Sequence, residues 1–368
     1  MALTGVHGFH FGIEAEFLLV NSETFRPLWH PQLRFDELNA ALESIPVKDF
    51  SCAGLKVEAP HRKPIPYVVE GYHVVDRDLK PVDLMPKGIE IRTPVCSSIE
   101  KCLTCLSVLH DRLQRKLQEL GYRAVVLSFH PTEDHFEGPQ NKRRYDHWQW
   151  AMEAMTTYGP DVNVSLPRDL AERLDLHELH GKVNYYAPAL VALTLASPLY
   201  RGDLWRIRGK IGKSVRTYHR STIAPAIEIH PDEHLRLEFK PFEMSRSLTD
   251  YHNYFLVWLT LILDDELKGR ATEQTRIYDL GQIARLGTDA EMVRERAAEV
   301  LNRAPHVLEP WGFDCEPLSE FRERLVTGRV PADDIIALFE REKSIPGVLR
   351  HLSDLSQLGT EHAFKQRA

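Results

Sequence analysis

Residues 11–20 read F-G-I-E-A-E-F-L-L-V, an alternation of apolar and acidic side chains that is typical of a β-strand. Successive side chains on a strand lie on opposite faces, so Glu14 and Glu16 share one face and Ile13 and Phe17 share the other. The two carboxylates would then be about 7 Å apart. The stretch therefore predicts a sheet surface that carries paired carboxylates.

Two further segments repeat this pattern. They are K-G-I-E-I-R-T-P at residues 87–94 and L-R-L-E-F-K-P-F-E-M at residues 235–244. Each predicted strand places a carboxylate and basic side chains on one face, Glu90 with Arg92, and Glu238 with Arg236 and Lys240. One interpretation is that every such Glu faces solvent on a one-sided antiparallel sheet.

A metal site is the other interpretation of the acidic strands. Carboxylates aligned on one surface repel one another unless cations neutralise them. Oxygen ligands at this density favour Mg²⁺ or Mn²⁺, with a phosphate held on the metal. The candidate metal ligands are Glu14, Glu16, Glu90 and Glu238.

The charge balance of the chain limits its partners. The 368 residues include 46 Lys and Arg against 53 Asp and Glu, a net charge of −7. This balance gives no electrostatic reason to bind nucleic acid or an anionic membrane, so neither is expected as a partner. Apolar runs such as 254–263 are too short to cross a membrane, and the N-terminus lacks a basic segment followed by an apolar core. A cytoplasmic location is expected.

The cysteine count favours a reducing compartment. Five cysteines, an odd number in a long chain, fit free thiols. Cys102 and Cys105 form a C-x-x-C, but the sequence has no second pair to complete a tetrahedral zinc site. Ser97 and Glu100 have the spacing of a capping box, and leucines continue an apolar face to Gly121. Helix packing is expected for the pair, with a redox or zinc role as the alternative.

Strands and helices mix along the chain without alternating as βαβ units. Besides the three glutamate-bearing segments, strands are predicted at 56–58, 68–75, 124–128 and 161–166, and helices at 36–44, 99–120, 170–179 and 187–196. A basic loop is expected over 206–220, followed by a hairpin that carries Glu238. From about residue 250 the pattern is helical.

These elements predict an α+β fold. Strands that pair by hairpins, with helices gathered elsewhere, favour a curved, largely antiparallel sheet covered by helices. No linker, low-complexity tract or repeat divides the chain, so one domain over 1–368 is expected. Its sheet-forming region would span about 8–245 and its helical region about 250–368.

Five segments, in order, resemble the glutamate–cysteine ligase type 2 family of carboxylate–amine ligases. They are F-G-I-E-A-E-F, G-I-E-I-R-T-P, D-V-N-V-S-L, A-L-V-A-L-T-L-A-S-P-L-Y-R-G and L-R-L-E-F-K-P-F-E. The resemblance implies a glutamine-synthetase-like fold, whose curved antiparallel sheet forms a funnel that binds divalent metals and ATP. Enzymes of this kind phosphorylate a carboxylate, and an amine attacks the acyl phosphate to form an amide. By position, the family's metal ligands match Glu14, Glu16, Glu90 and Glu238.

One segment departs from the family pattern. Family members usually carry a histidine-rich H-x-H strand where this chain has Asp161-Val162-Asn163-Val164. Asp161 and Asn163 lie on one face of the predicted strand, so they are candidates to ligate metal or to hydrogen-bond substrate. The change leaves the standard substrate of the family open, and cysteine is not carried over as the acceptor amine.

The basic loop offers cations for a phosphate. In-line phosphoryl transfer needs positive charge on the migrating group, which Arg or Lys supplies together with the metals. The undifferentiated candidates are Lys210, Lys213, Arg216 and Arg220, with solvated surface as the alternative interpretation. The chain has no Walker A sequence, so a P-loop is not expected.

The expected activity is ATP-dependent ligation of a small carboxylic acid and an amine, with Mg²⁺ or Mn²⁺ bridging the ATP phosphates. The candidate catalytic residues are Glu16, Glu90 and Arg92. Arg92 or Arg236 could hold a substrate carboxylate, such as the α-carboxylate of a glutamate-like acid, and Lys240 is a further candidate for substrate or nucleotide binding. The alternatives are a metal-dependent amide or phosphate hydrolase, which needs no ATP, and a catalytically silent relative that binds a ligand. The oligomeric state is left open, a homo-oligomer included.

Overall fold

A seven-stranded sheet organises the computed structural model, which describes residues 8–140, 144–220 and 224–355. The strand order is β10-β11-β5-β1-β3-β2, and β1 pairs with β5 through its first half and with β4 through its last residues. Every pairing in this sheet is antiparallel. The strands are β1 (His10–Asn21), β2 (Tyr67–Val75), β3 (Pro81–Arg92), β4 (Tyr122–Val125), β5 (Pro160–Ser165), β10 (Ile227–His230) and β11 (Arg236–Phe239).

Two short hairpins and a set of helices complete the described part of the chain. The hairpins are β6 (Leu199–Tyr200) with β7 (Asp203–Leu204), and β8 (Arg206–Ile207) with β9 (Lys210–Ile211). The helices are α1 (Phe35–Glu43), α2 (Ile99–Glu119), α3 (Tyr145–Ala154), α4 (Arg168–Ala171), α5 (Leu176–Ala192), α6 (Val215–Arg220), α7 (Leu248–Leu263), α8 (Glu273–Leu286), α9 (Glu291–Leu308), α10 (Ser319–Thr327), α11 (Pro331–Glu342) and α12 (Ile345–Arg350), with 3-10 turns at Gly287–Asp289, Glu309–Trp311 and Glu316–Leu318. The domain predicted over 1–368 also includes residues 1–7, 141–143, 221–223 and 356–368, which lie outside the described residues.

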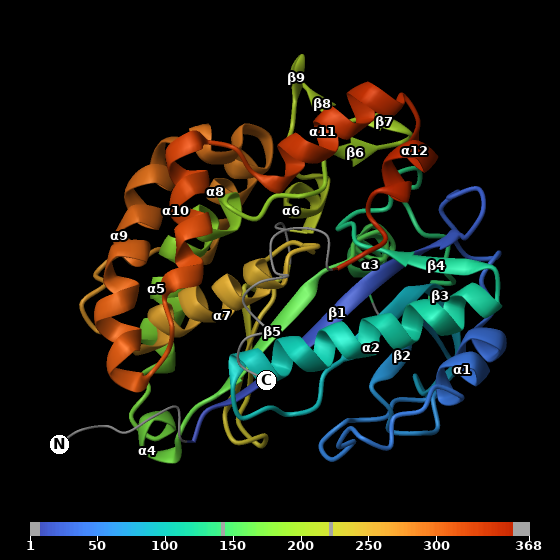
Figure 1. Ribbon diagram of the computed structural model, residues 1–368, viewed down its shortest axis with the longest axis horizontal. Coiled ribbons are helices and arrows are strands. Elements are labelled where there is room, and N and C mark those ends of the chain that lie inside the picture. Colours follow the sequence, from blue (N-terminus) through green and yellow to red (C-terminus); the bar gives the residue numbers. More distant parts are fainter. Residues whose placement is uncertain (1–7, 141–143, 221–223, 356–368) are drawn as a thin grey trace.

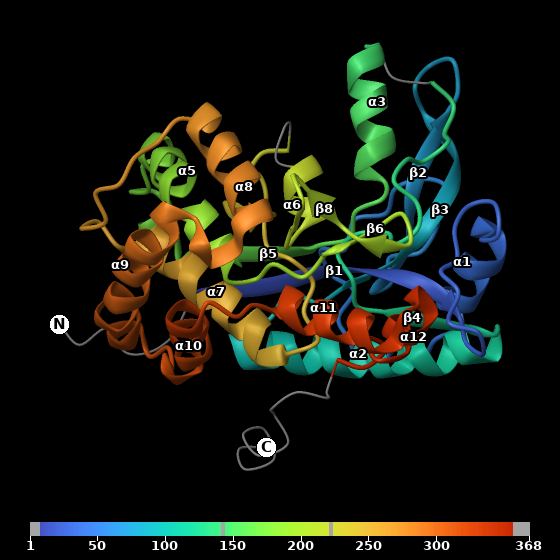
Figure 2. The same ribbon diagram turned by 90° about the horizontal axis from the view of Figure 1, so that it is seen from above.

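Helices cover one side of the sheet and leave the other side for the site. α2 packs on β1 and β4, and α7 packs on β5. Figure 2 shows α2 on one side of β1, whereas α3 and the outer parts of β2 and β3 rise on the opposite side. The side chains of β1 that face the helical layer, among them Phe11, Ile13 and Phe17, are buried. Their burial fixes which face of the strand is left for polar groups.

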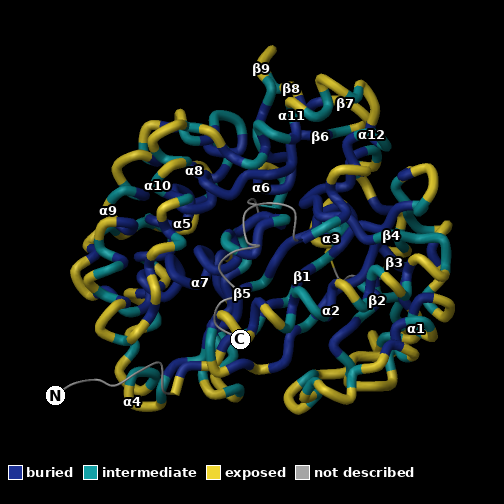
Figure 3. Tube along the Cα trace, viewed as in Figure 1, coloured by how far each residue is buried: buried dark blue, intermediate teal, exposed yellow. Residues whose placement is uncertain are grey.

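The second half of the core is built around α7. This helix is apolar almost all round, and every residue from Asp250 to Ile262 is buried, as expected for a helix enclosed by others. α5 and α9 pack directly against it. Figure 1 shows α8 and α10 in the same group of helices, and Figure 3 shows α7, β1 and β5 in the buried interior. The predicted α+β class, a largely antiparallel sheet covered by helices, is confirmed.

Three predicted elements are wrong in detail. Residues 56–58 form no strand and lie in irregular chain between α1 and β2. The helix expected over 170–179 is interrupted, because Asp175 caps α5 by accepting hydrogen bonds from the backbone N–H groups of His177 and Glu178. The basic loop expected over 206–220 is the β8–β9 hairpin followed by α6.

Cys102 is fully buried on α2, in line with the expected packing role. All five cysteines are free thiols. Among the described residues, none of them joins a group of side chains spaced to hold a metal ion.

The helices of the described ranges include none with both the length and the apolar character needed to cross a membrane. The cytoplasmic location stays a prediction.

Candidate functional site

The acidic face of β1 meets β3 in the register that the sequence pattern suggests. Glu16 lies across from Glu90, and Glu14 lies across from Arg92. Arg92 Nε donates a hydrogen bond to Glu90. The carboxylates predicted from two separate segments are therefore neighbours on one surface.

The other edge of β1 extends this surface through β5 to β11. Glu14 lies across from Asp161, and Glu238 lies across from Asn163. Lys240 Nζ donates to Asp161 at 2.9 Å. The structure thus brings the predicted residues of β1, β3, β5 and β11 onto a single polar face.

A compact group of three carboxylates occupies the part of this face formed by β1, β2 and β3. One oxygen from each of Glu16, Glu70 and Glu90 lies within 4.8 Å of the others, and we call this group the carboxylate triad. Lys87 is buried beside it, where its Nζ donates to Glu16 at 3.0 Å and lies 3.8 Å from Glu70. The triad therefore has an internal cation at one edge.

A β-bulge brings Lys87 to this face. Glu70 of β2 pairs with Gly88, but the next residue, Gly71, pairs with Pro86, so Lys87 has no partner across the pair of strands. An extra residue in one strand changes the direction of its side chain. Strict alternation would have placed Lys87 on the core face, so the bulge supplies a charge that the periodic pattern does not predict.

When all three groups of the carboxylate triad are ionised, the protein does not balance their negative charge. Burial raises the pKa of Glu70 well above its usual range, and nearby Glu16 adds to this although Lys87 opposes it. Burial also raises the pKa of Glu90 against the opposing effect of Arg92. Three carboxylates face two cations here, and closely spaced carboxylate oxygens are the donors that Mg²⁺ and Mn²⁺ prefer. The residues fit a divalent cation.

Glu14 lies apart from the triad. Burial, reinforced by the charge of Glu90, raises the pKa of Glu14 to about 8, although Arg92 opposes the shift. Among the described residues, Glu14 belongs to no group of three ligands within 4.8 Å.

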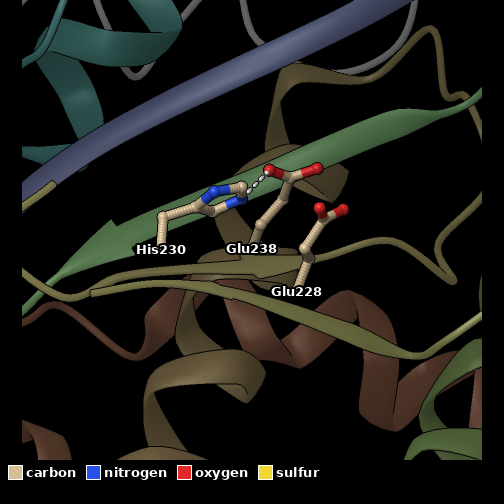
Figure 4. Close-up of side chains that lie close together, drawn as sticks. All are labelled: Glu228, His230 and Glu238. Carbon is tan, nitrogen blue, oxygen red and sulfur yellow. Dashed lines mark hydrogen bonds and ion pairs between the residues drawn. The ribbon is translucent and has the colours of Figure 1, made fainter. Parts of the chain in front are cut away.

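Glu238 is surrounded by basic side chains. One carboxylate oxygen accepts from Lys240 Nζ, and the other accepts from Arg236 Nη1 at 2.6 Å and lies 3.1 Å from His230 Nε2. Burial alone would raise the pKa of Glu238, but Lys240 and Arg236 outweigh it and hold that pKa below its usual value. Figure 4 shows Glu228, His230 and Glu238 pointing toward one another from β10 and β11, and their ligand atoms form a second group within 4.8 Å among the described residues.

Two adjoining cavities open onto the polar face. The larger, of about 610 Å³, is lined by the carboxylate triad, by Lys87, Arg220 and Lys240, and by an apolar wall that includes Trp150 and Met155. The smaller, of about 290 Å³, is lined by side chains that include Glu14, Asn163, His230, Arg236 and Glu238. Lys56, Glu58 and Arg92 line both cavities, so the two share this wall.

The four basic candidates of residues 206–220 occupy different places. Arg220 lines the larger cavity. Arg216 is buried and donates to the backbone carbonyls of Lys240 and Pro241, so it supports the end of β11 from within. Lys213 pairs with a carboxylate of α11, and Lys210 is exposed on β9; neither lines the cavity.

Two members of the site, Glu70 and Lys87, are not among the residues predicted from the sequence. Glu70 stands in an apolar strand directly before Gly71, and an acidic residue in such a run is a usable signal. The direction of Lys87 depends on the bulge, for which the hydrophobic period carries no signal.

Comparisons with known proteins agree with this architecture. The family model described as glutamate–cysteine ligase family 2 matches residues 10–224, more than half of the chain. A protein of Rhodospirillum rubrum named "Putative glutamate–cysteine ligase 2" is 30% identical over 120 residues, which are 31% of this chain and 30% of that protein. A protein of the same name from Paracidovorax citrulli is 25% identical over 147 residues, 38% of each chain. The matches thus span about a third of these relatives' length.

Solved structures share the fold at low sequence identity. A bifunctional glutathione synthetase from Pasteurella multocida superposes with a TM-score of 0.64 at 17% identity, covering 94% of this chain and 52% of that one. A glutamate–cysteine ligase from Francisella tularensis, crystallised with AMP, gives 0.62 at 12% identity, covering 94% and 88%. The ligase PafA, in complex with the ubiquitin-like protein Pup, gives 0.51 at 13% identity, covering 96% and 75%. From the match of the family model over residues 10–224, the chain belongs to the glutamate–cysteine ligase family 2.

Proposed function

We propose that the protein is an ATP-dependent carboxylate–amine ligase, which joins a small carboxylic acid to an amine through an acyl phosphate. The observation that carries the proposal is the larger cavity, which combines the carboxylate triad with Lys87, Arg220 and Lys240 in a chain of this family. Such a site suits the triphosphate of ATP, because a divalent cation and basic side chains together can balance its charge.

The carboxylate triad would hold Mg²⁺ or Mn²⁺. When bound, the cation neutralises and orients the β- and γ-phosphate oxygens. Glu70 joins the predicted ligands Glu16 and Glu90 in this assignment, because its carboxylate belongs to the same group. Glu238 is left out of this assignment, because Arg236 and Lys240 already bind its carboxylate.

Side chains of the larger cavity would position the nucleotide. Arg220 and Lys240 would contact phosphate oxygens, where their charge offsets the charge of the migrating group. The apolar wall that includes Trp150 and Met155 suits the adenine ring, since an aromatic side chain gives a flat apolar surface at small entropic cost.

The acid would bind from the smaller cavity, next to the wall that the two cavities share. Arg92 lies in that wall and lines both spaces. Its planar guanidinium can hold a carboxylate by paired hydrogen bonds. A glutamate-like acid suits this position, because one of its two carboxylates can bind Arg92 while the other is presented to the nucleotide. A γ-glutamyl amide is the product we expect.

The reaction proceeds in two displacements. An oxygen of the substrate carboxylate attacks the γ-phosphorus, the bond to the β-phosphate oxygen breaks, and ADP leaves. The amine nitrogen then attacks the acyl carbon and loses a proton, and phosphate leaves with one of the former carboxylate oxygens. Arg92 would offset charge on the attacking carboxylate, and Arg220 with Lys240 would offset charge on the phosphoryl group.

A substrate panel tests this proposal. ADP release is measured with ATP and Mg²⁺, with glutamate and other small acids, each in the presence of a panel of amines. We expect ADP release that requires Mg²⁺, one acid and one amine together. Amide or phosphate hydrolysis at an unchanged rate without ATP would refute it, as would folded, metal-loaded protein that releases no ADP with any pair.

A further inference from the structure

The carboxylate of Glu238 is already bound by side chains of the protein itself. Lys240 donates to one oxygen, whereas Arg236 donates to the other at 2.6 Å and His230 Nε2 lies 3.1 Å from that second oxygen. The Glu238 side chain is only 5% exposed. A divalent cation would have to displace at least one of these basic groups to reach it.

The side chain of Arg236, on β11, reaches across to the neighbouring strand β5. Its Nη1 donates to Asn163 Oδ1 as well as to Glu238, and its Nε donates to Glu233 at 2.8 Å. Asn163 lies directly across from Glu238 in the sheet. The guanidinium therefore occupies the position from which a metal ion would bridge these two oxygen-bearing side chains.

Lys240 plays the corresponding part at the edge of the sheet. Its Nζ donates to Asp161 and to Glu238, and it lies 3.5 Å from Glu228. The group of Glu228, His230 and Glu238 in Figure 4 has the spacing of a metal site. The Lys240 ammonium, however, already lies beside both of its carboxylates.

The carboxylate triad differs in this respect. Lys87 donates to Glu16, but its distance of 3.8 Å from Glu70 is longer than a hydrogen bond. Arg92 reaches Glu90 from the shared wall. Lys87 thus pairs with two of the three carboxylates and Arg92 with the third, so two cations at the edges face three carboxylates and leave one negative charge unbalanced when all three are ionised.

We propose that this face binds one divalent cation, at the carboxylate triad, and that Arg236 and Lys240 act as built-in cations in place of a second ion beside Glu238. Arg236 is a positioning residue, since it holds Asn163 and Glu238 together, whereas Lys240 balances the charge of Asp161 and Glu238 and also lines the larger cavity. The role given to the metal ion, which is to hold ATP, rests on the proposed function. The number of bound ions does not depend on which substrates the protein uses.

Manganese titration tests the number of sites. Free Mn²⁺ is followed by electron paramagnetic resonance as it is added to the full chain without nucleotide, and we expect one bound ion per chain. Glu70→Gln should remove this ion, whereas the matched change Glu238→Gln on the same sheet face should keep it. Arg236→Met should raise the count from one to two, because it exposes the oxygens of Glu238 and Asn163. Arg236→Gln serves the same purpose if the Met variant does not fold.

Several outcomes would overturn the inference: two ions in the wild type, no bound ion, a loss on Glu238→Gln with retention on Glu70→Gln, or an unchanged count in both folded Arg236 variants. ADP release on the same preparations separates the inference from the proposed function. If the protein binds two ions and has full ligase activity, only the inferred number of metal ions is wrong. If the protein binds one ion but releases no ADP with any pair of the substrate panel, only the proposed function is wrong.

Discussion

Glu16 is held in a single orientation by two donors, one on β3 and one in the residue directly before β5. Lys87 donates to one of its oxygens at 3.0 Å and also to the carbonyl of Thr157 at 2.8 Å. The backbone N–H of Gly159 donates to the other oxygen at 2.9 Å. Partners of this kind fix a carboxylate before a cation arrives, which is what a metal ligand of defined geometry needs.

Replacing Glu16 tests the triad at the level of one residue. Glu16→Gln keeps the shape of the side chain but removes the charge that would bind the cation, so ligase turnover should fall at least about 100-fold. The melting temperature should change little. Glu119→Gln, on the exposed end of α2, is the control and should keep full turnover. Near-normal activity in folded Glu16→Gln protein would remove this residue from the site.

Residue-level prediction from the sequence depends on where the strand pattern is regular. Glu16, Glu90 and Glu238 could be placed on one face because side chains alternate without interruption around each of them. Lys87 could not, because its direction is set by the bulge opposite Gly71. In the sequence, Lys210, Lys213 and Arg220 look alike, because all three are basic residues of one segment. Only the fold of this segment, a hairpin followed by α6, shows that they occupy different places.

At the scale of elements, β1 and β3 approach closely at Gly88. A Cβ added there would lie 2.2 Å from the Phe17 carbonyl oxygen, a backbone atom that cannot move without disturbing the central strand. Gly88→Ala should therefore lower the free energy of unfolding by about 2 kcal/mol or more. Urea denaturation measures this.

Gly281 provides the matched control. It lies inside α8, and a Cβ added there meets no atom within 4 Å. Gly281→Ala should raise the free energy of unfolding by about 0.5–1 kcal/mol, because glycine has poor helix propensity. Equal effects of the two substitutions would contradict the close approach of β1 and β3.

The packing of α2 on the sheet makes stability depend on pH. Burial lowers the pKa of His110 to about 3. The unfolded chain takes up a proton there below about pH 6.5, whereas the folded protein does not until about pH 3. The free energy of unfolding should therefore fall as the pH falls through this window, by about 1.4 kcal/mol for each pH unit.

Urea titrations between pH 5 and 7 check this contribution. His110→Gln should reduce the slope of stability against pH, because glutamine does not titrate. His177→Gln, at an exposed position of α5, should leave the slope as it is. A slope in His110→Gln equal to that of the wild type would show that the histidine is not held neutral in the core.

Elements with strong periodicity could be predicted, and those that depend on local capping could not. The apolar stripe of α2 repeats from Ile99 to Leu117, so the type and extent of this helix follow from the sequence. The break between α4 and α5 depends on the side chain of Asp175, which turns the backbone by accepting two N–H groups. Residues 56–58 are too few for a period to decide between strand and loop.

At the scale of the whole molecule, the site depends on strand order. β1 lies between β3 and β5, and β11 follows β5, so residues from Glu14 to Lys240 meet on one face. The hairpin pattern of the sequence indicates an antiparallel sheet. The spacing of apolar residues, however, does not show which strands are neighbours in that sheet. The order of motifs, through its resemblance to a family, supplied the architecture that the residues alone left open. The two cavities and their shared wall follow from that order.

The proposed ligase forms an acyl phosphate from ATP, and the transfer of an oxygen isotope from the acid to phosphate would reveal this intermediate. Glutamate labelled with ¹⁸O in its carboxylates is incubated with the protein, ATP, Mg²⁺ and the amine panel, and the released phosphate is examined by mass spectrometry. Because an oxygen of the substrate leaves with the phosphoryl group, we expect one ¹⁸O atom per phosphate released. Amide formation with unlabelled phosphate, or amide formation without ATP, would contradict it.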